Sequence, residues 1–414
     1  MKMCSSFRME RSISCILVVV TGLFLQTVQA QAVATSTLYE GARLITGDGS
    51  APIEDSAFLV EFDRITWVGH RGEVSYPADV AHVDLTGKTV MPAIIDTHKH
   101  LAGERAELIG QLSSLAYFGV GVAMSLGQDV TDVPFEVHEE MIPGTARVYS
   151  AGRGITMPEP GRSEAPYWIK TAEEGRTAVR EQVERQVDFI KIWVDDRDGK
   201  YQKMPPEIYS EIIDEAHKSR IRVTAHIFRL EDAKGLLRAG VDAFAHGIRD
   251  KDIDDEVLDL FKTHPGVVVV PNLADRGVAS DMSWLKGGVS DDELAKIQAA
   301  AVDDPKAQQI YAIQARNLMR MYKAGIKLAF GTDGSIPWAA HMEMEDMVAA
   351  GLSPSDVITI ATKNSAELME LSDSGMIAKN KMADFIVLDA NPLKNITNTR
   401  KIIAVYIRGV KVKR

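Results

Sequence analysis

The sequence predicts a (β/α)8 (TIM) barrel with a small β-sandwich formed by both termini. Two observations predict it: strand-like runs gather at both ends of the chain, and between them apolar strands alternate with helices over about 280 residues. The chain has 414 residues, 45% hydrophobic and 25% charged, which is typical of a globular protein. A doubly wound open sheet is the alternative architecture for the same alternation.

Residues 1–32 are expected to form a signal peptide. Basic residues precede an apolar run at 13–25, and small residues near Ala30 offer cleavage sites. A run of about 13 residues is too short for a membrane span, which needs about 20. Both cysteines, Cys4 and Cys15, lie in this segment, so a mature chain would form no disulfide. We therefore expect export to the periplasm or outside the cell, without a membrane anchor after cleavage.

The two parts of the sandwich are expected at 33–90 and 373–414. Apolar runs such as 57–62 and 383–388 have the length and composition of strands. Because these runs lie at opposite ends of the chain, they indicate one β-domain assembled from both termini.

The barrel is expected to occupy residues 91–372. Its eight predicted strands are 90–95, 121–124, 148–150, 189–194, 221–225, 243–245, 267–270 and 327–330. Helical patterns, for example at 207–218, separate these runs. A proline-rich loop at 157–168 follows the third strand, where it could lie over the barrel mouth.

Polar side chains recur at the ends of these strands, where the active-site groups of barrels converge. His98 and His100 follow the first strand, and alternate residues of a strand share a face. His226 and His246 end the fifth and sixth strands, and Asp333 follows the eighth. Each residue alone has a plainer interpretation in a loop, a turn or the core. Their equivalent positions together indicate a metal site, and imidazole suits zinc and similar ions.

Lys191 lies inside the apolar fourth strand. A buried ammonium must find a partner or lose its proton. A neutral lysine can capture carbon dioxide as a carbamate, an anion that can bridge two cations. A salt-bridged lysine at a strand end is the alternative interpretation.

Two longer motifs accompany these residues, at 84–100 on entry to the barrel and at 375–392 on return to the sandwich. With them, the chain resembles the amidohydrolase superfamily from Leu38 to Lys413, and in particular its imidazolonepropionase/prolidase-like branch, which includes Xaa-Pro dipeptidases. The resemblance implies two divalent metal ions, with zinc expected. The metal ligands that it implies are His98, His100, Lys191, His226, His246 and Asp333.

In the arrangement that the resemblance implies, the first two histidines and Asp333 bind the more buried ion, and the last two bind the second. Lys191, carboxylated on Nζ, would bridge them. The ion pair would activate a bridging hydroxide, and Asp333 would act as general base and then as general acid.

Several positions depart from the family pattern. Lys99, between two predicted ligands, is more often apolar, and its side chain is expected to point away from the ions. Ala93 and Asn380 stand where the family usually has glycine, and Phe228 stands where related dipeptidases often have tyrosine. The loop after the third strand also lacks a common Gly-Gly-His run. The metal ligands are therefore expected to be intact, while the substrate is left open.

The expected reaction is hydrolysis of an amide bond in a dipeptide, an N-acyl amino acid or a xenobiotic amide. Deamination is disfavoured, because Arg229 occupies the position where a deaminase needs glutamate. A lactonase or phosphotriesterase on the same metal core is one alternative. A non-catalytic, metal-binding scaffold is another, against which the presence of Asp333 argues.

Candidate substrate contacts follow the strand ends: Trp193, Phe228, Arg249 and Trp338. Arg249 could grip a substrate carboxylate, although an ion pair with Asp250 or Asp252 is the favoured interpretation. The three aromatic residues could line an apolar pocket or simply pack. The net charge of −11 and the lack of a basic run exclude a typical nucleic-acid binder. The expected partner is a small-molecule amide, and a homo-oligomer is compatible with the sequence.

Overall fold

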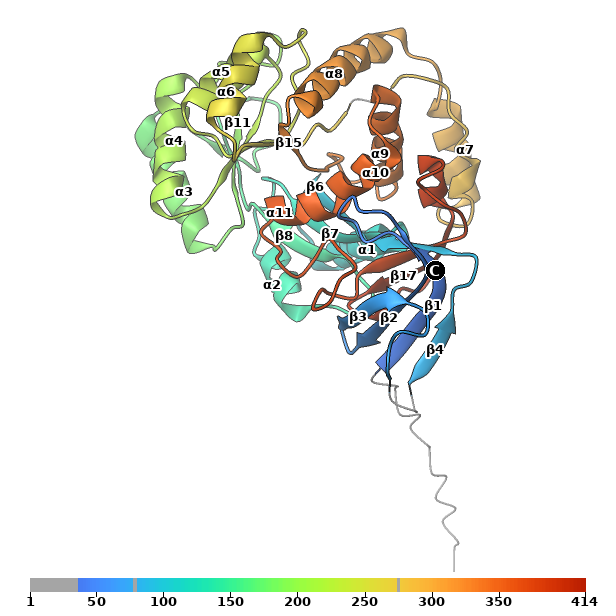
Figure 1. The fold of residues 1–414 in the computed structure, drawn as a ribbon. Coiled ribbons are helices and arrows are strands. Elements are labelled where there is room, and N and C mark those ends of the chain that lie inside the picture. The colour runs from blue at the N-terminus through green and yellow to red at the C-terminus, as the bar shows by residue number, and fades with distance from the viewer. Residues whose placement is uncertain (1–35, 77–79, 274–275) are drawn as a thin grey trace, which may run out of the picture. The chain divides into compact units, whose positions relative to one another are not determined.

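Eight strand positions close into a barrel in the computed structural model, which describes residues 36–76, 80–273 and 276–414 (Figure 1). The barrel strands are β6 (Ile94–Lys99), β7 (Val120–Ser125), β8 (Arg147–Ser150), β11 (Ile190–Trp193), β12 (Val223–His226), β13 (Ala243–Phe244), β14 (Val268–Val269) and β15 (Lys327–Leu328). Every predicted barrel strand overlaps one of them. The predicted signal peptide, 1–32, lies outside the described residues. Within the described part, no helix has the length and apolar character needed to cross a membrane.

The barrel closes at two junctions, one at its third strand and one between its eighth and first strands. After β8 the chain continues as β9 (Ile155–Thr156), so that β8 pairs with β7 while β9 pairs in parallel with β11. At the other junction, the backbone nitrogen of Thr97 donates to the carbonyl of Phe330 over 2.9 Å, next to β6 and β15. The closed barrel excludes the doubly wound open sheet.

Two predicted boundaries need correction. The first predicted strand, 90–95, is divided: β5 (Thr89–Pro92) belongs to the sandwich sheet, and β6 begins at Ile94. The predicted loop 157–168 ends earlier, because β10 (Tyr167–Trp168) pairs in parallel with β9. At the first place the chain passes from the sandwich sheet to the barrel, and at the second two residues extend the barrel sheet, which local composition does not reveal.

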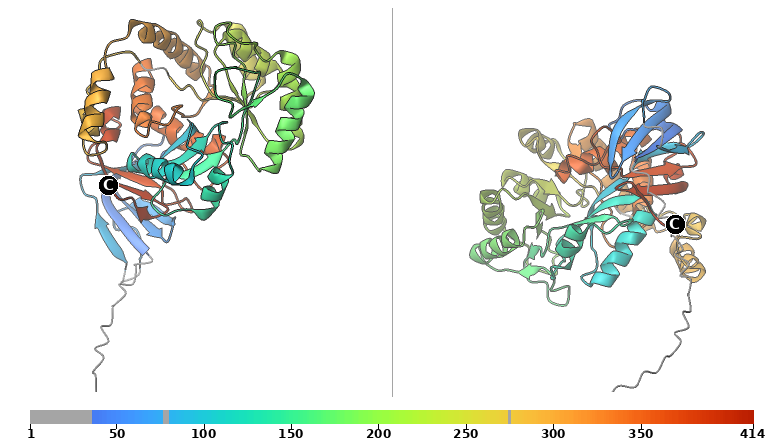
Figure 2. Two further views of the ribbon diagram at one scale, coloured as in Figure 1. Left: turned by 180° about the vertical axis from the view of Figure 1, so that it is seen from behind. Right: turned by 90° about the horizontal axis from the view of Figure 1, so that it is seen from below.

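Helices surround the barrel strands (Figure 2). The α-helices are α1 (Arg105–Tyr117), α2 (Val133–Glu140), α3 (Ala172–Glu184), α4 (Pro206–Lys218), α5 (Leu230–Arg238), α6 (Asp255–Thr263), α7 (Asp291–Ala300), α8 (Pro305–Lys323), α9 (Ala339–Ala350), α10 (Pro354–Thr359) and α11 (Ser365–Leu368). Short turns of other helix types are η1 (Ser283–Leu285), η2 (Ile360–Asn364) and η3 (Ile396–Arg400). Local sequence sets several starts: Thr171 and Glu174 form a capping box on α3, and Asp304 caps α8 just before Pro305.

The sandwich sheet joins both ends of the described chain, as predicted. Its remaining strands are β1 (Ser36–Leu44), β2 (Ile53–Glu61), β3 (Arg64–His70), β4 (Ala81–Asp84), β16 (Phe385–Leu388), β17 (Ile402–Ile407) and β18 (Val410–Lys411). The strand order is β18-β17-β16-β5-β1-β2-β3, and β4 pairs with β1. Strand β1 runs parallel to both β4 and β5. The N-terminal and C-terminal strands therefore belong to one sheet.

Four aromatic rings hold the two halves of the sandwich together. Phe385 stacks on Tyr406 with ring centroids 4.6 Å apart, and Tyr39 stacks on Phe58 at 4.9 Å. The two pairs meet edge to face, with Phe385 5.1 Å from both Tyr39 and Phe58. Such pairs add stability beyond the burial of their area.

Phe385→Ala is expected to lower the free energy of unfolding by about 3–5 kcal/mol, because it empties a fully buried ring position between the two halves. Denaturant unfolding followed by circular dichroism measures this change. The control Phe62→Ala removes a ring that is 78% exposed and should change the value by less than about 0.5 kcal/mol. Equal losses in both variants would contradict the proposed importance of the aromatic cluster.

Candidate active site

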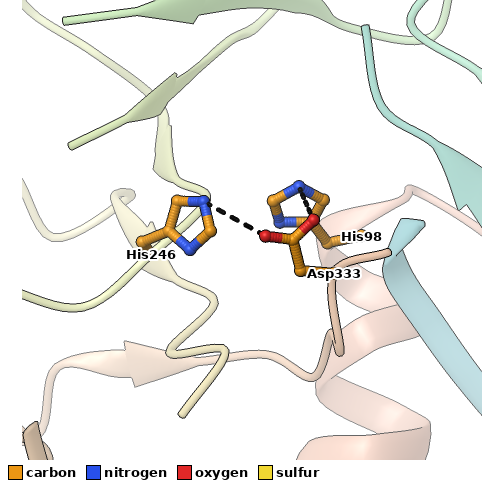
Figure 3. Close-up of side chains that lie close together, drawn as sticks. All are labelled: His98, His246 and Asp333. Atoms are coloured by element: carbon orange, nitrogen blue, oxygen red, sulfur yellow. Dashed lines mark ion pairs between the residues drawn. The ribbon is translucent and has the colours of Figure 1, made fainter. Parts of the chain in front are cut away.

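Asp333 is the carboxylate at the centre of the site. It follows β15 in a stretch, 331–336, that is neither helix nor strand. Its carboxylate reaches His100 Nε2 at 3.0 Å and His98 Nε2 at 3.7 Å through Oδ1, and His246 Nε2 at 3.8 Å through Oδ2. Figure 3 shows the carboxylate lying between the rings of His98 and His246. One side chain thus contacts histidines from two different strands.

The ionisation state of Asp333 follows from these neighbours. Burial alone would raise the pKa of its carboxyl, but the hydrogen bond from His100 and the electrostatic influence of the neighbouring imidazoles of His98 and His100 hold the pKa below its usual range. Asp333 is therefore ionised at neutral pH. An ionised carboxylate can bind a cation or accept a proton.

The predicted histidines form a buried cluster. The ring centroids of His98 and His246 lie 5.0 Å apart, and those of His246 and His226 lie 4.4 Å apart. Burial lowers the pKa of His226 to about 3, and it also lowers the pKa values of His98 and His246 well below the usual range. These imidazoles are neutral at pH 7. Neutral imidazole is the form that binds metals.

Lys191 lies beside the same histidines. Its charge contributes to the low pKa values of His98, His226 and His246. Its side chain is buried, and among the described residues Nζ has no hydrogen-bond partner. Burial lowers the pKa of Lys191 to about 7. The structure does not show the salt-bridged lysine that was the alternative interpretation of this position.

The residues present fit a metal site. One ligand atom each from His98, His246 and Asp333 lie within 4.8 Å of one another. Imidazole nitrogens and a carboxylate are the donors that zinc takes in catalytic sites. The buried Nζ of Lys191 has no hydrogen-bond partner in the part of the chain that the structure describes, which is the situation expected of a group that becomes a ligand after modification.

Two neighbours of His226 were missed by sequence reasoning. His226 Nε2 lies 3.1 Å from Asp195 Oδ2 and 3.0 Å from Arg197 Nη1. Arg197 also contacts Asp195 at 2.8 Å and Glu159 at 3.2 Å. Glu159 lies in the loop after β9, so this loop is tied to the site through Arg197. The sequence feature that could have identified both residues is the charged run 195–198, which directly follows the fourth strand.

Asn272 is a further residue that sequence reasoning missed. Its side-chain nitrogen lies 2.5 Å from His98 Nδ1 and 3.4 Å from His246 Nδ1, and it also donates to the carbonyl of Ala245. The amide therefore lies behind two predicted ligands, where it helps to set their ring orientation. Asn272 follows the seventh strand, and the rule that polar groups gather at strand ends could have identified it.

Arg249 does not form the ion pair that was the favoured interpretation. Asp252 pairs with Arg316, and Asp250 accepts a hydrogen bond from the backbone of Leu230. Among the described residues, Arg249 makes no ion pair within 4 Å: Nη2 donates to the carbonyl of Ile227 over 2.9 Å, and the buried Nε has no partner. Its guanidinium lies 5.0 Å from the ring of Phe228.

The other two aromatic candidates lie in different places. The ring of Trp193 is 5.2 Å from Lys191 Nζ, close to the predicted ligands. Trp338 instead packs in a cluster with Phe118 and Leu285, its ring 5.9 Å from that of Phe118. Of the two interpretations left open for Trp338, packing is the one that the structure shows. Trp338 follows the eighth strand in sequence and directly precedes α9.

Known proteins share this fold and sequence pattern. Ochratoxinase from Aspergillus niger is 25% identical over 425 residues, covering 88% of this chain and 83% of that protein. Imidazolonepropionase from Streptomyces coelicolor is 25% identical over 378 residues, covering 84% and 91%. The fold matches the crystal structure of a Xaa-Pro dipeptidase with methionine bound in the active site, with a TM-score of 0.74, 21% identity and coverage of 92% and 100%.

The family assignment rests on the greater part of the chain. The model of the amidohydrolase family matches residues 89–412, from strand β5 to the last strand of the sandwich sheet. The match includes the complete barrel and all six predicted ligands. The chain belongs to the amidohydrolase family.

Proposed function

We propose that this protein is an exported, metal-dependent hydrolase that cleaves an amide bond next to a free carboxylate, as in a dipeptide or an N-acyl amino acid. The observation that carries the proposal is the convergence of neutral imidazoles, Lys191 and the ionised Asp333 at one end of the barrel. The names of the relatives support it, since ochratoxinase, imidazolonepropionase and a dipeptidase are all hydrolases.

The residues that would hold two divalent ions follow the family resemblance. His98, His100 and Asp333 would hold one ion, the other two histidines the second, and Lys191, carboxylated on Nζ, would lie between them. When bound, two such ions lower the pKa of a water molecule and polarise a carbonyl. The site chemistry favours zinc, although manganese and iron accept the same donors.

Asp333 would handle the proton. Its pKa lies below the usual range, so the carboxylate is free at neutral pH to accept a proton from the attacking water. The same oxygen can then donate that proton to the departing amine. Its side chain is 42% exposed, so it can reach a substrate entering from the barrel mouth.

Arg249 would recognise the substrate. Charged groups that are largely buried are normally paired, but no carboxylate of the described residues lies within 4 Å of this guanidinium. A carboxylate on the substrate would supply the missing partner and accept two hydrogen bonds from the fork. The ring of Phe228 supports the guanidinium from one side. This interpretation favours amino-acid amides over uncharged xenobiotic amides.

The export proposal leads to a direct prediction. Residues 1–32 combine a basic start, an apolar run and small residues near Ala30. In a bacterial host, the full chain is expected in the periplasm or the medium with its N-terminus cleaved close to residue 32. N-terminal sequencing and intact mass measure the cleavage point. Uncleaved protein in the cytoplasm would contradict the proposal.

Metal content and Lys191 give the second prediction. Elemental analysis of the active protein is expected to find about two ions per chain, and chelation should abolish activity. Lys191→Ala should lose nearly all activity because it removes the bridging group, and short carboxylic acids should restore part of it. Lys363→Ala, which removes an exposed lysine paired with Glu367, is the control and should keep full activity. Active enzyme without metal would refute the proposed mechanism.

Arg249→Met tests the substrate class. With carboxylate-bearing amides, its KM is expected to rise about 10²-fold, because losing a buried charge pair costs about 2–5 kcal/mol. With the same substrates amidated at the carboxylate, wild type and variant should perform equally poorly. Arg222→Met is a matched control, since its guanidinium also covers a ring, that of Phe189, but lies before β12 at the opposite end of that strand. An equal effect on both substrate classes would rule out carboxylate recognition.

A further inference from the structure

Lys99 is a buried lysine that the proposed mechanism leaves unused. It is the last residue of β6, between the predicted ligands His98 and His100, and its side chain is fully buried. The hydrogen bonds that the described residues offer Lys99 Nζ come from Thr332 and Ile336, and not from either imidazole. An apolar residue is usual at this position in the family. The ammonium therefore requires a separate explanation.

Its contacts lead to the segment that carries Asp333. Lys99 Nζ donates to the hydroxyl of Thr332 over 2.9 Å and to the carbonyl of Ile336 over 3.0 Å. The hydroxyl of Thr332 in turn donates to Asp96 Oδ2 over 2.7 Å, and Asp96 also accepts from the backbone nitrogen of Thr332 at 3.1 Å. Lys99 thus grips the residue before Asp333 and the residue three positions after it.

The charge of Lys99 is balanced locally. Asp96 Oδ2 lies 3.8 Å from Nζ, and both side chains are buried. Because the two charges are opposite in sign and the hydroxyl of Thr332 hydrogen-bonds to both groups, the ammonium can remain in the interior. The ammonium of Lys99 and the hydroxyl of Thr332 therefore find hydrogen-bond partners without any contribution from the predicted histidine ligands.

The gripped segment depends on such support. Residues 331–336 form no helix or strand, and Asp333 adopts a left-handed backbone with φ of 59°. That conformation costs a non-glycine residue about 1–3 kcal/mol and persists only where the surroundings enforce it. The backbone supplies two ties: Asp333 N donates to His98 O over 2.8 Å, and His100 N donates to Gly334 O over 3.0 Å. Lys99 adds one hydrogen bond before Asp333, to Thr332, and one after it, to Ile336.

We propose that Lys99 is a positioning residue, whose ammonium clamps Thr332 and Ile336 and so fixes the Asp333 carboxylate against the histidine cluster. The inference rests on the proposed function only in that Asp333 is taken as a ligand and proton carrier. A methionine at this position would fill similar space but make neither polar tie. The position of the Asp333 carboxylate therefore depends on Lys99, which is neither a predicted metal ligand nor a predicted substrate contact.

The test compares Lys99→Met and Thr332→Val with the wild-type protein. Hydrogen exchange of peptides covering 331–337 is expected to speed up, because the clamp is lost on one or both sides. Zinc affinity should fall about 10–100-fold, as it does when outer contacts of ligands are removed. With a substrate in hand, kcat should fall about 10²-fold with little change in KM, because the carboxylate is misplaced rather than removed.

Lys234→Met is the matched control. Lys234 is also a buried, paired lysine, but it contacts Asp254 and Glu256 on the outer helices. Its loss should lower stability without changing exchange at 331–337, zinc affinity or kcat. Since Lys99→Met leaves Asp96 uncompensated, the double variant Asp96→Asn/Lys99→Met replaces it if the single variant does not fold, with the same expected result.

Unchanged exchange at 331–337 and unchanged zinc affinity in both variants would overturn the proposal. So would an increase in exchange spread evenly over the chain and not concentrated at 331–337, because that is loss of general stability. If the wild-type protein hydrolyses no amide, the proposed function fails. Exchange and zinc affinity then still decide whether Lys99 positions Asp333.

Discussion

The ionised carboxylate of Asp333, among buried basic nitrogens, is the constraint on which the site depends. Burial removes the water that would stabilise a charge on His98, His226 or His246, so their pKa values fall and each ring keeps one unprotonated nitrogen. The same loss of water lowers the pKa of Lys191. Asp333 then carries the one full negative charge that contacts several of these groups. Desolvation, which is unfavourable for each group alone, creates a set of metal ligands.

The barrel brings this set together because equivalent strand ends meet at one end of the fold. That rule needs only the order of apolar runs, and this explains why the convergence of these side chains could be expected from sequence. His226 and His246 are separated by 20 positions, but His226 ends β12 and His246 follows its neighbour β13. Lys191 could be singled out because an ammonium in an apolar strand conflicts with its surroundings. The sandwich was predictable for a similar reason, since its short strands recur at both ends of the chain.

Contacts made by loops could not be predicted in the same way. Arg197 contacts His226 from a charged turn, whereas Trp338 packs against Phe118 in a separate cluster, although both residues follow strand ends in sequence. Lys99 was expected to point away from the predicted ions, but its partner Thr332 lies 233 positions away and could not be identified. Side-chain direction within a strand follows from a period of two residues. The identity of a distant partner depends on how irregular segments pack, for which the sequence has no period.

The parallel pairing of β1 with β5 has a consequence for how the protein is made. Strand β5 is joined on its other side to β16, so the N-terminal strands of the sheet can meet its C-terminal strands only after residues 385–388 have been made. During synthesis, the aromatic rings of Tyr39 and Phe58 emerge long before their partners Phe385 and Tyr406. Until the last strands are translated, a nascent chain presents these rings to solvent or to a chaperone. Contacts so distant in sequence slow folding, because a long loop must close before they form.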